Sequence, residues 1–215
     1  MPSDPTAVPP PVVKTYLDHP RQPSLRLPPG ASDCHVHVFG PQSRFPYASD
    51  RRATPADAPK ETLFALHRRL GIERCVIVQS IVHGFDNRVV EDAITAGGGR
   101  YLGVALVPTD VPDHELQRLA VGGFRAVRFN FMQHLAGGHR VEDVLALTPR
   151  LAAVGMHLQV HFESALVHTV GQSLLRSAVP VVIDHMGRVD ATLGVQHADS
   201  QALMRLLDAP GMHVK

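Results

Sequence analysis

The alternation of short β-rich runs with longer segments of helical period is the feature that most limits how this 215-residue chain can fold. Seven apolar runs predict strands at 33–39, 74–80, 101–107, 124–130, 156–162, 180–185 and 212–215. The segments between them predict helices at 60–71, 87–99, 113–123, 141–155, 163–178 and 200–211. Strand and helix repeated with short connections predict an α/β fold with a parallel sheet and crossover helices.

Two architectures share this alternation, an open doubly wound sheet and a closed (β/α)8 TIM barrel. The open sheet of a dinucleotide-binding protein would show a glycine-rich phosphate turn, and the chain contains neither GxGxxG nor GxxxxGK(S/T). A barrel instead expects polar residues where its strands end, as found at His37, Ser80, Asn130, His161 and His185. We therefore predict a TIM barrel. Because a closed barrel has eight strands, we expect this one to be truncated within its seventh strand.

Composition divides the chain into two regions and indicates which partners and which compartment to expect. Residues 1–30 are rich in proline and predict an N-terminal arm, and 31–215 predict an incomplete barrel domain. A net charge of +1 gives no general attraction to nucleic acid. No apolar run is long enough to span a membrane, and the first residues lack the features of a signal peptide, so we expect a cytoplasmic protein. Cys34 and Cys75 lie in apolar runs and are expected to be buried, reduced thiols.

The stretch DCHVHVFGP, residues 33–41, places two histidines on alternate positions of an apolar run. On a strand, His35 and His37 would share one face, and Cys34 and Val36 would lie on the other. Imidazoles at the mouth of a barrel can bind a metal or polarise a carbonyl. Core histidines that are simply hydrogen-bonded are the alternative. The paired spacing on a first strand favours a functional role.

Four segments in order, DCHVHVFGP, FPYASDRRATPADAP, RFNF and VVIDHMGR, resemble the amidohydrolase superfamily. More narrowly they are similar to the family of 2-pyrone-4,6-dicarboxylate hydrolases and related lactone hydrolases. The resemblance implies an amidohydrolase-type (β/α)8 barrel that opens a small carboxylated lactone to an open-chain acid, as in aromatic catabolism. It implies catalytic roles for His35, His37 and His185. It also implies substrate-binding roles for Tyr47, Ser80, Arg128, His161 and Arg188.

Three departures from the family pattern leave the cofactor and the substrate open. The family's water-activating aspartate belongs to an eighth strand, which lies beyond the sequence given. His134 stands in the segment where a second carboxylate-binding arginine is expected. His161 stands where the pyrone hydrolases, which work without a metal, have a tyrosine. The cofactor is therefore either none or one divalent metal, zinc or manganese, held by His35, His37, His161 and His185.

Each substrate-binding residue has a structural alternative. Arg128 could pair with a neighbouring carboxylate, and Arg188 could pair with Asp184 or Asp190. Tyr47 could serve in packing alone, and Ser80 could cap the segment that follows it. For each of these residues, the sequence leaves open whether the side chain contacts a substrate or only stabilises the fold.

Four further histidines are expected to be exposed to solvent, His67 on a helix surface and His83, His134 and His139 in loops. Two further functions stay open beside the lactone hydrolase. One is a metal-dependent amidohydrolase or decarboxylase on the same barrel. The other is an inactive fragment or non-catalytic paralogue, whose unpaired barrel edges would favour self-association into a homo-oligomer.

Overall fold

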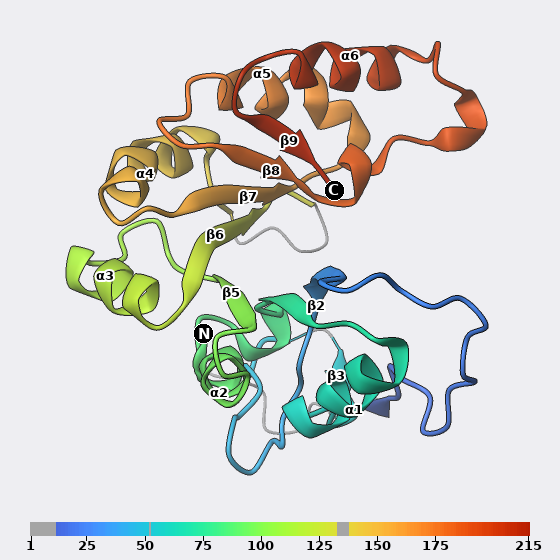
Figure 1. Cartoon of the computed structure of the whole chain (residues 1–215). Coiled ribbons are helices and arrows are strands. Elements are labelled where there is room, and N and C mark those ends of the chain that lie inside the picture. Colours follow the sequence, from blue (N-terminus) through green and yellow to red (C-terminus); the bar gives the residue numbers. More distant parts are fainter. Residues whose placement is uncertain (1–11, 52, 133–137) are drawn as a thin grey trace, which may run out of the picture. The chain divides into compact units, whose positions relative to one another are not determined.

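The computed structural model describes residues 12–51, 53–132 and 138–215. The chain forms two compact units, Met1–Gly103 and Val104–Lys215, and each is described by itself (Figure 1). Across the described residues, no helix combines the length and apolar character needed to cross a membrane.

The first unit is built on parallel strands that alternate with helices. Its strands follow the order β2 (Ser32–Val36), β4 (Arg74–Val78) and β5 (Tyr101–Ala105), the last of which continues into the second unit. The helices are α1 (Lys60–Leu70) and α2 (Arg88–Ala96), with a 3-10 turn η1 (Ile81–His83). Helix α1 ends at Gly71, whose φ of 76° lets its backbone N–H donate to the carbonyl of His67. This left-handed cap is one that glycine adopts without steric cost.

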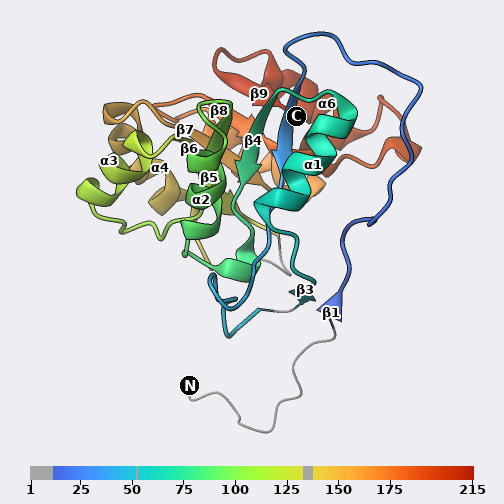
Figure 2. The same cartoon turned by 60° about the horizontal axis from the view of Figure 1, so that its bottom comes forward.

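The described part of the N-terminal arm lies against this same unit. Strand β1 (Val12–Val13) pairs in parallel with β3 (Thr54–Pro55), with Val12 beside Thr54 (Figure 2). Further along, the Gln22 amide donates to the backbone carbonyl of Arg69 at 2.8 Å. The arm is therefore held by backbone pairing and by a contact with the end of α1.

The second unit contains four parallel strands in the order β6, β7, β8 and β9 (Figure 1). Their bounds are Phe124–Asn130, His157–His161, Val181–Ile183 and Met212–Val214. The helices are α3 (Asp113–Val121), α4 (Val141–Ala153), α5 (Val170–Leu174) and α6 (Ala198–Leu207), with 3-10 segments η2 (Ser164–His168), η3 (Asp184–Arg188) and η4 (Ala191–Leu193). Helix α3 packs on β6, α4 on β7 and α6 on β9.

The two faces of this second sheet differ in chemistry. The residues on one face are fully buried apolar side chains, among them Val127, Phe129, Leu158, Val160, Val181 and Ile183. The alternating positions form the opposite face, and the register places Arg128 beside Gln159 and Asn130 beside His161. Since successive strand residues point to opposite faces, the apolar residues form the core. The polar residues gather on the other side, toward the C-terminal ends of the strands.

The predicted strands and four of the six predicted helices are confirmed within three residues at their ends. The helix predicted at 200–211 is α6, which begins two residues earlier and ends four residues earlier, at Leu207. The segment 163–178, predicted as one helix, forms η2 and the short α5 with a break at Thr169. His67 was also wrongly expected to be exposed. It lies on the inner face of α1, where its Nδ1 is 3.0 Å from the Tyr101 hydroxyl and its Nε2 is 3.7 Å from Asp33.

The two cysteines have different environments. Both were expected to be buried, but Cys34 is exposed and only Cys75 is buried. Burial raises the pKa of the Cys75 thiol, and thiolates are the reactive form. We expect iodoacetamide to modify Cys34 alone in the native protein and both cysteines in denaturant, as counted by mass spectrometry of the intact chain. Modification of Cys75 at a comparable native rate would contradict this packing.

Candidate active site

The first unit places the paired histidines at the end of β2. The ring centroids of His35 and His37 are 5.1 Å apart with the rings edge to face. His37 lies just beyond the strand end, and its Nδ1 is 2.7 Å from the carbonyl oxygen of Val78 on β4. A carbonyl only accepts hydrogen bonds, so Nδ1 carries the proton and Nε2 carries the lone pair of the neutral ring.

Tyr47 and Ser80 both have structural partners. The Tyr47 hydroxyl donates to Asp57 Oδ1 at 3.0 Å, and the ring packs edge to face on His83 at 4.7 Å. Burial, followed by the hydrogen bond to Asp57, raises the pKa of Tyr47. Ser80 caps η1, because its side chain accepts from the backbone N–H of Val82. The proposed capping role of Ser80 is therefore observed, and contact with a substrate stays a prediction for both residues.

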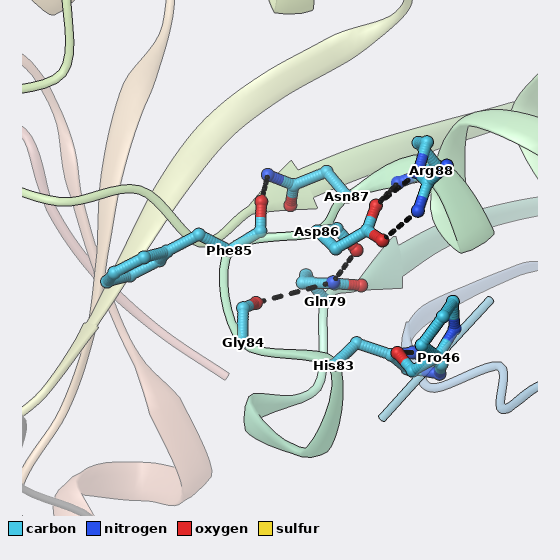
Figure 3. A network of polar contacts seen from close by, with 8 residues as sticks. All are labelled: Pro46, Gln79, His83, Gly84, Phe85, Asp86, Asn87 and Arg88. Carbon is cyan, nitrogen blue, oxygen red and sulfur yellow. Dashed lines mark hydrogen bonds and ion pairs between the residues drawn. The ribbon is translucent and has the colours of Figure 1, made fainter. Parts of the chain in front are cut away.

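His83 was wrongly expected to lie in a solvated loop. It is 3% exposed, and its Nδ1 is 3.1 Å from the carbonyl of Pro46 (Figure 3). Its Nε2 accepts from the backbone N–H of Gly40 at 3.4 Å. Burial lowers its pKa. The neutral imidazole thus joins two points of the loop after His37. The sequence signal for this burial is the position of His83, three residues after Ser80 and therefore on the same helical turn.

The segment after β4 is fixed by a second set of polar contacts. The Gln79 amide donates to the carbonyl of Asp86 at 2.6 Å (Figure 3). The Asp86 carboxylate in turn accepts from Arg88 Nε at 2.7 Å and from its Nη2. Such side-chain contacts to backbone satisfy polar groups that the turn leaves unpaired. They hold the connection between β4 and α2 in one conformation.

Gly40 allows the close approach of the loop to Asp57. Its φ is 66°, and a Cβ placed there would lie 2.2 Å from Asp57 Oδ1 and 2.9 Å from the backbone nitrogen of Gln42. We expect Gly40→Ala to lower the free energy of unfolding by more than the ~1–2 kcal/mol of a left-handed alanine, because Asp57 must also move. Urea denaturation measures this. Gly30→Ala is the matched control, since Gly30 has a φ of 78° and no atom within 4 Å of the added Cβ. Equal losses would contradict a steric role for Gly40.

The second unit gathers two cations around a buried carboxylate. Arg128 Nε donates to Asp184 Oδ2 at 2.6 Å, and Lys215 Nζ lies 2.8 Å from Asp184 Oδ1. Asp184 is 0% exposed and Arg128 is 6% exposed. Burial alone would raise the pKa of Asp184, but Arg128 and Lys215 lower it overall. Asp184 was considered as a partner of Arg188, and the structure instead pairs it with Arg128 and Lys215.

Beside this cluster lie the histidines of β7 and of the turn after β8. The ring centroids of His161 and His185 are 4.9 Å apart, edge to face. Burial, and then the positive charge of Arg128, lower the pKa of His161 to about 4. Burial also lowers the pKa of His185. Both rings are therefore expected to be neutral near pH 7.

His185 stands in a turn with unusual backbone geometry. His185, Met186 and Arg188 have φ values of 54°, 51° and 52°, and Gly187 between them has 61°. The Met186 N–H donates to the carbonyl of Lys215 at 2.7 Å, which ties the turn to the end of β9. Left-handed non-glycine residues cost about 1–3 kcal/mol each and concentrate at functional sites. The side chain of Arg188 is exposed at the end of this turn.

The structure brings the predicted residues together in groups. In the first unit His35 lies with His37, and Tyr47 lies with His83. In the second unit His161 lies with His185 and near the charge cluster of Arg128. Sequence reasoning missed three members of that second group: Asp184 as the partner of Arg128, Lys215, and Asn130 as the partner of His161. His134 lies outside the described residues, and His139 is half-buried with its ring edge-on to Phe129.

Parallel strands that alternate with helices, with histidines and an arginine toward the strand ends, define an α/β protein of the parallel-sheet class. The model of the amidohydrolase family matches residues 32–215. The chain therefore belongs to the amidohydrolase family.

Within the amidohydrolase family, the chain is similar to proteins named as lactone hydrolases. The chain is 39% identical over 192 residues to 2-pyrone-4,6-dicarboxylate hydrolase of Comamonas testosteroni, covering 89% of this chain and 63% of that protein. It is 37% identical over 193 residues to 4-sulfomuconolactone hydrolase of Hydrogenophaga intermedia, with 88% and 63% covered. A solved structure from Pseudomonas putida, described as a 2-pyrone-4,6-dicarboxylic acid hydrolase, is 30% identical with a TM-score of 0.76, covering 87% of this chain and 68% of that one. The chain thus spans 63% of the length of these two curated relatives.

Proposed function

We propose that the protein hydrolyses a carboxylated lactone of the 2-pyrone-4,6-dicarboxylate type to an open-chain acid. The observation that carries this proposal is the buried Arg128–Asp184 pair beside two neutral histidines at the ends of β6, β7 and β8. The names of the relatives support the same chemistry. The family resemblance, and not the placement of the two units, assigns residues of both units to one reaction.

Arg128 is proposed to bind a substrate carboxylate. Its hydrogen bond to Asp184 uses Nε, so the Nη atoms are the donors that a carboxylate would meet. A guanidinium keeps its charge and presents two parallel N–H groups, which suits bidentate carboxylate binding. Arg188, exposed on the turn after β8, is proposed to hold the second anionic group. Tyr47 and Ser80 are proposed to contact the substrate from the first unit.

The histidines are proposed to act on the lactone carbonyl. His35, His37 and His185 would stabilise the negative charge that develops on the carbonyl oxygen when water attacks. The ring C–O bond then breaks, and the ring oxygen takes up a proton to become the free hydroxyl or enol of the product.

A divalent metal fits the chemistry of these donors. His37 and His161 each use Nδ1 in a hydrogen bond within the protein, to the Val78 carbonyl and to Asn130 Oδ1. Such partners leave Nε2 as the nitrogen that imidazole offers to zinc or manganese. We propose His35, His37, His161 and His185 as the residues that would hold it. When bound, a metal supplies a Lewis acid that polarises the lactone carbonyl.

The test is ring opening of 2-pyrone-4,6-dicarboxylate and of 4-sulfomuconolactone, assayed with this chain and with the complete reading frame that contains it. Each assay is run before and after chelation, and after zinc or manganese is restored. His185→Asn should lower the turnover rate by about 10²-fold or more. His168→Asn is the control, because His168 is an exposed residue paired with Asp199. No ring opening of either lactone by any form would overturn the proposal. Activity that survives chelation would exclude the metal.

A further inference from the structure

Asn130 and His161 form a buried pair at the ends of β6 and β7. The strand register sets them side by side, and the Phe131 N–H donates to the His161 carbonyl at 2.7 Å. Asn130 Oδ1 lies 3.2 Å from His161 Nδ1, and both side chains are buried. The contact is therefore fixed by the backbone of two central strands.

The chemistry of the amide decides where the proton of His161 resides. The amide Oδ1 only accepts hydrogen bonds, so Nδ1 must be the protonated nitrogen of the neutral ring. The lone pair then belongs to Nε2. This Nε2 is buried and has no hydrogen-bond partner among the residues that the structure describes. Buried polar atoms are nearly always paired, so this Nε2 is a position where a water molecule or an ion can serve as the partner.

The position of His161 offers this lone pair to a ligand that accepts an electron pair. The ring lies at the end of β7 and is 6% exposed. His185, 4.9 Å away between ring centroids, supplies a second imidazole in the same unit.

We propose that Asn130 is a positioning residue that locks the Nδ1–H tautomer of His161 and thereby presents Nε2 to a divalent cation. Asn130 itself touches neither cation nor substrate. The proposal deepens the proposed function, which already names His161 as a cation ligand, by adding Asn130 as the residue that orients it. It rests on that function for the cation site and for the identity of the reaction.

The first arm of the test is nitrogen NMR of histidine-labelled, chelator-treated protein near pH 7. We expect the Nδ1–H tautomer for His161 in the wild type. In Asn130→Asp the carboxylate can accept the same hydrogen, so the tautomer should persist. In Asn130→Leu it should shift toward a mixture. A wild-type His161 with its proton on Nε2 would overturn the proposal without any variant, even if Asn130→Leu fails to fold.

The second arm is Zn²⁺ titration followed by the His161 Nε2 resonance and by calorimetry. Loss of the orienting partner of a metal-binding histidine costs about 10- to 100-fold in affinity. We expect Asn130→Leu to show that loss and Asn130→Asp to retain most of the affinity. Asn87→Ser, which changes another buried asparagine that bonds to the Phe85 carbonyl, should leave Zn²⁺ binding unchanged. Unchanged affinity in Asn130→Leu, or no response of Nε2 to Zn²⁺, would overturn the cation-binding role.

Both arms use resting protein without lactone. Their outcome is therefore independent of whether the protein opens 2-pyrone-4,6-dicarboxylate. A locked tautomer with weakened Zn²⁺ binding in Asn130→Leu would stand even if the lactonase assignment failed. If the protein opens the lactone ring but the His161 resonance does not respond to Zn²⁺, the lactone hydrolase assignment stands and the role of Asn130 in cation binding is contradicted.

Discussion

Replacing Arg128 with methionine is expected to lower the free energy of unfolding by about 3–5 kcal/mol, because it removes one partner of a buried ion pair. Asp184 is fully buried and accepts from Arg128 Nε at 2.6 Å. Methionine fills much of the same space but leaves the carboxylate with Lys215 as its remaining charged partner in the second unit. Urea denaturation of the two proteins gives the difference.

Arg125→Met is the matched control on the same strand. Arg125 is exposed and donates to the backbone carbonyls of Ala120 and Phe124. Its replacement should cost less than about 1 kcal/mol, the usual effect of a surface change. Similar losses in the two variants would mean that the Arg128–Asp184 pair does not organise the ends of β6 and β8.

Acid should destabilise the chelator-treated protein through His161. Its folded-state pKa is about 4, below its ordinary value of 6.5. Between these values the unfolded chain binds more protons than the folded one, so stability falls as the pH drops through this window. At about 1.4 kcal/mol per pKa unit, the loss of stability from His161 between pH 7 and pH 4 is on the order of 3 kcal/mol. Free energies of unfolding measured from pH 7 to pH 4 test this.

His161→Gln supplies the comparison for this prediction. Glutamine does not titrate, so the free energy of unfolding of the His161→Gln variant should depend less steeply on pH across the same window. Burial also lowers the pKa values of His83, His157 and His185, and these remain in both proteins. The quantity to compare is therefore the difference between the two curves. Parallel curves would show that His161 is not buried in its neutral form.

The strands and most of the helices could be predicted because their signals are local. Apolar runs of four to seven residues, helical spacing of leucines and glycine at helix ends all act within one element. The same reasoning placed His37, Ser80, Asn130, His161 and His185 near strand ends, where the structure has them. The break at Thr169 gave no such signal, because the composition of 163–178 suits one continuous helix.

The partners in the site could not be predicted, because they come from contacts between distant elements. Asp184 was considered, with Asp190, only as a possible ion-pair partner of Arg188, which lies four residues after Asp184 in the chain. Its true partner is Arg128, 56 residues earlier in the chain. His67 and His83 looked like surface residues because histidine is polar, and tertiary contacts with Tyr101, Pro46 and Gly40 bury them. Likewise Cys34 lies in an apolar run but is exposed.

The central claim is that Arg128 binds a carboxylate of a lactone substrate. Its most direct test is the equilibrium binding of 2-pyrone-4,6-dicarboxylate, compared with that of unsubstituted 2-pyrone, to the wild type and to Arg128→Lys. Lysine keeps the charge but loses the planar pair of donors. We predict that the dicarboxylate binds about 10- to 100-fold more weakly to the variant, the range expected for a lost hydrogen bond to a charged group, while the uncharged lactone binds equally to both. Equal binding of the dicarboxylate to the two proteins would contradict the claim.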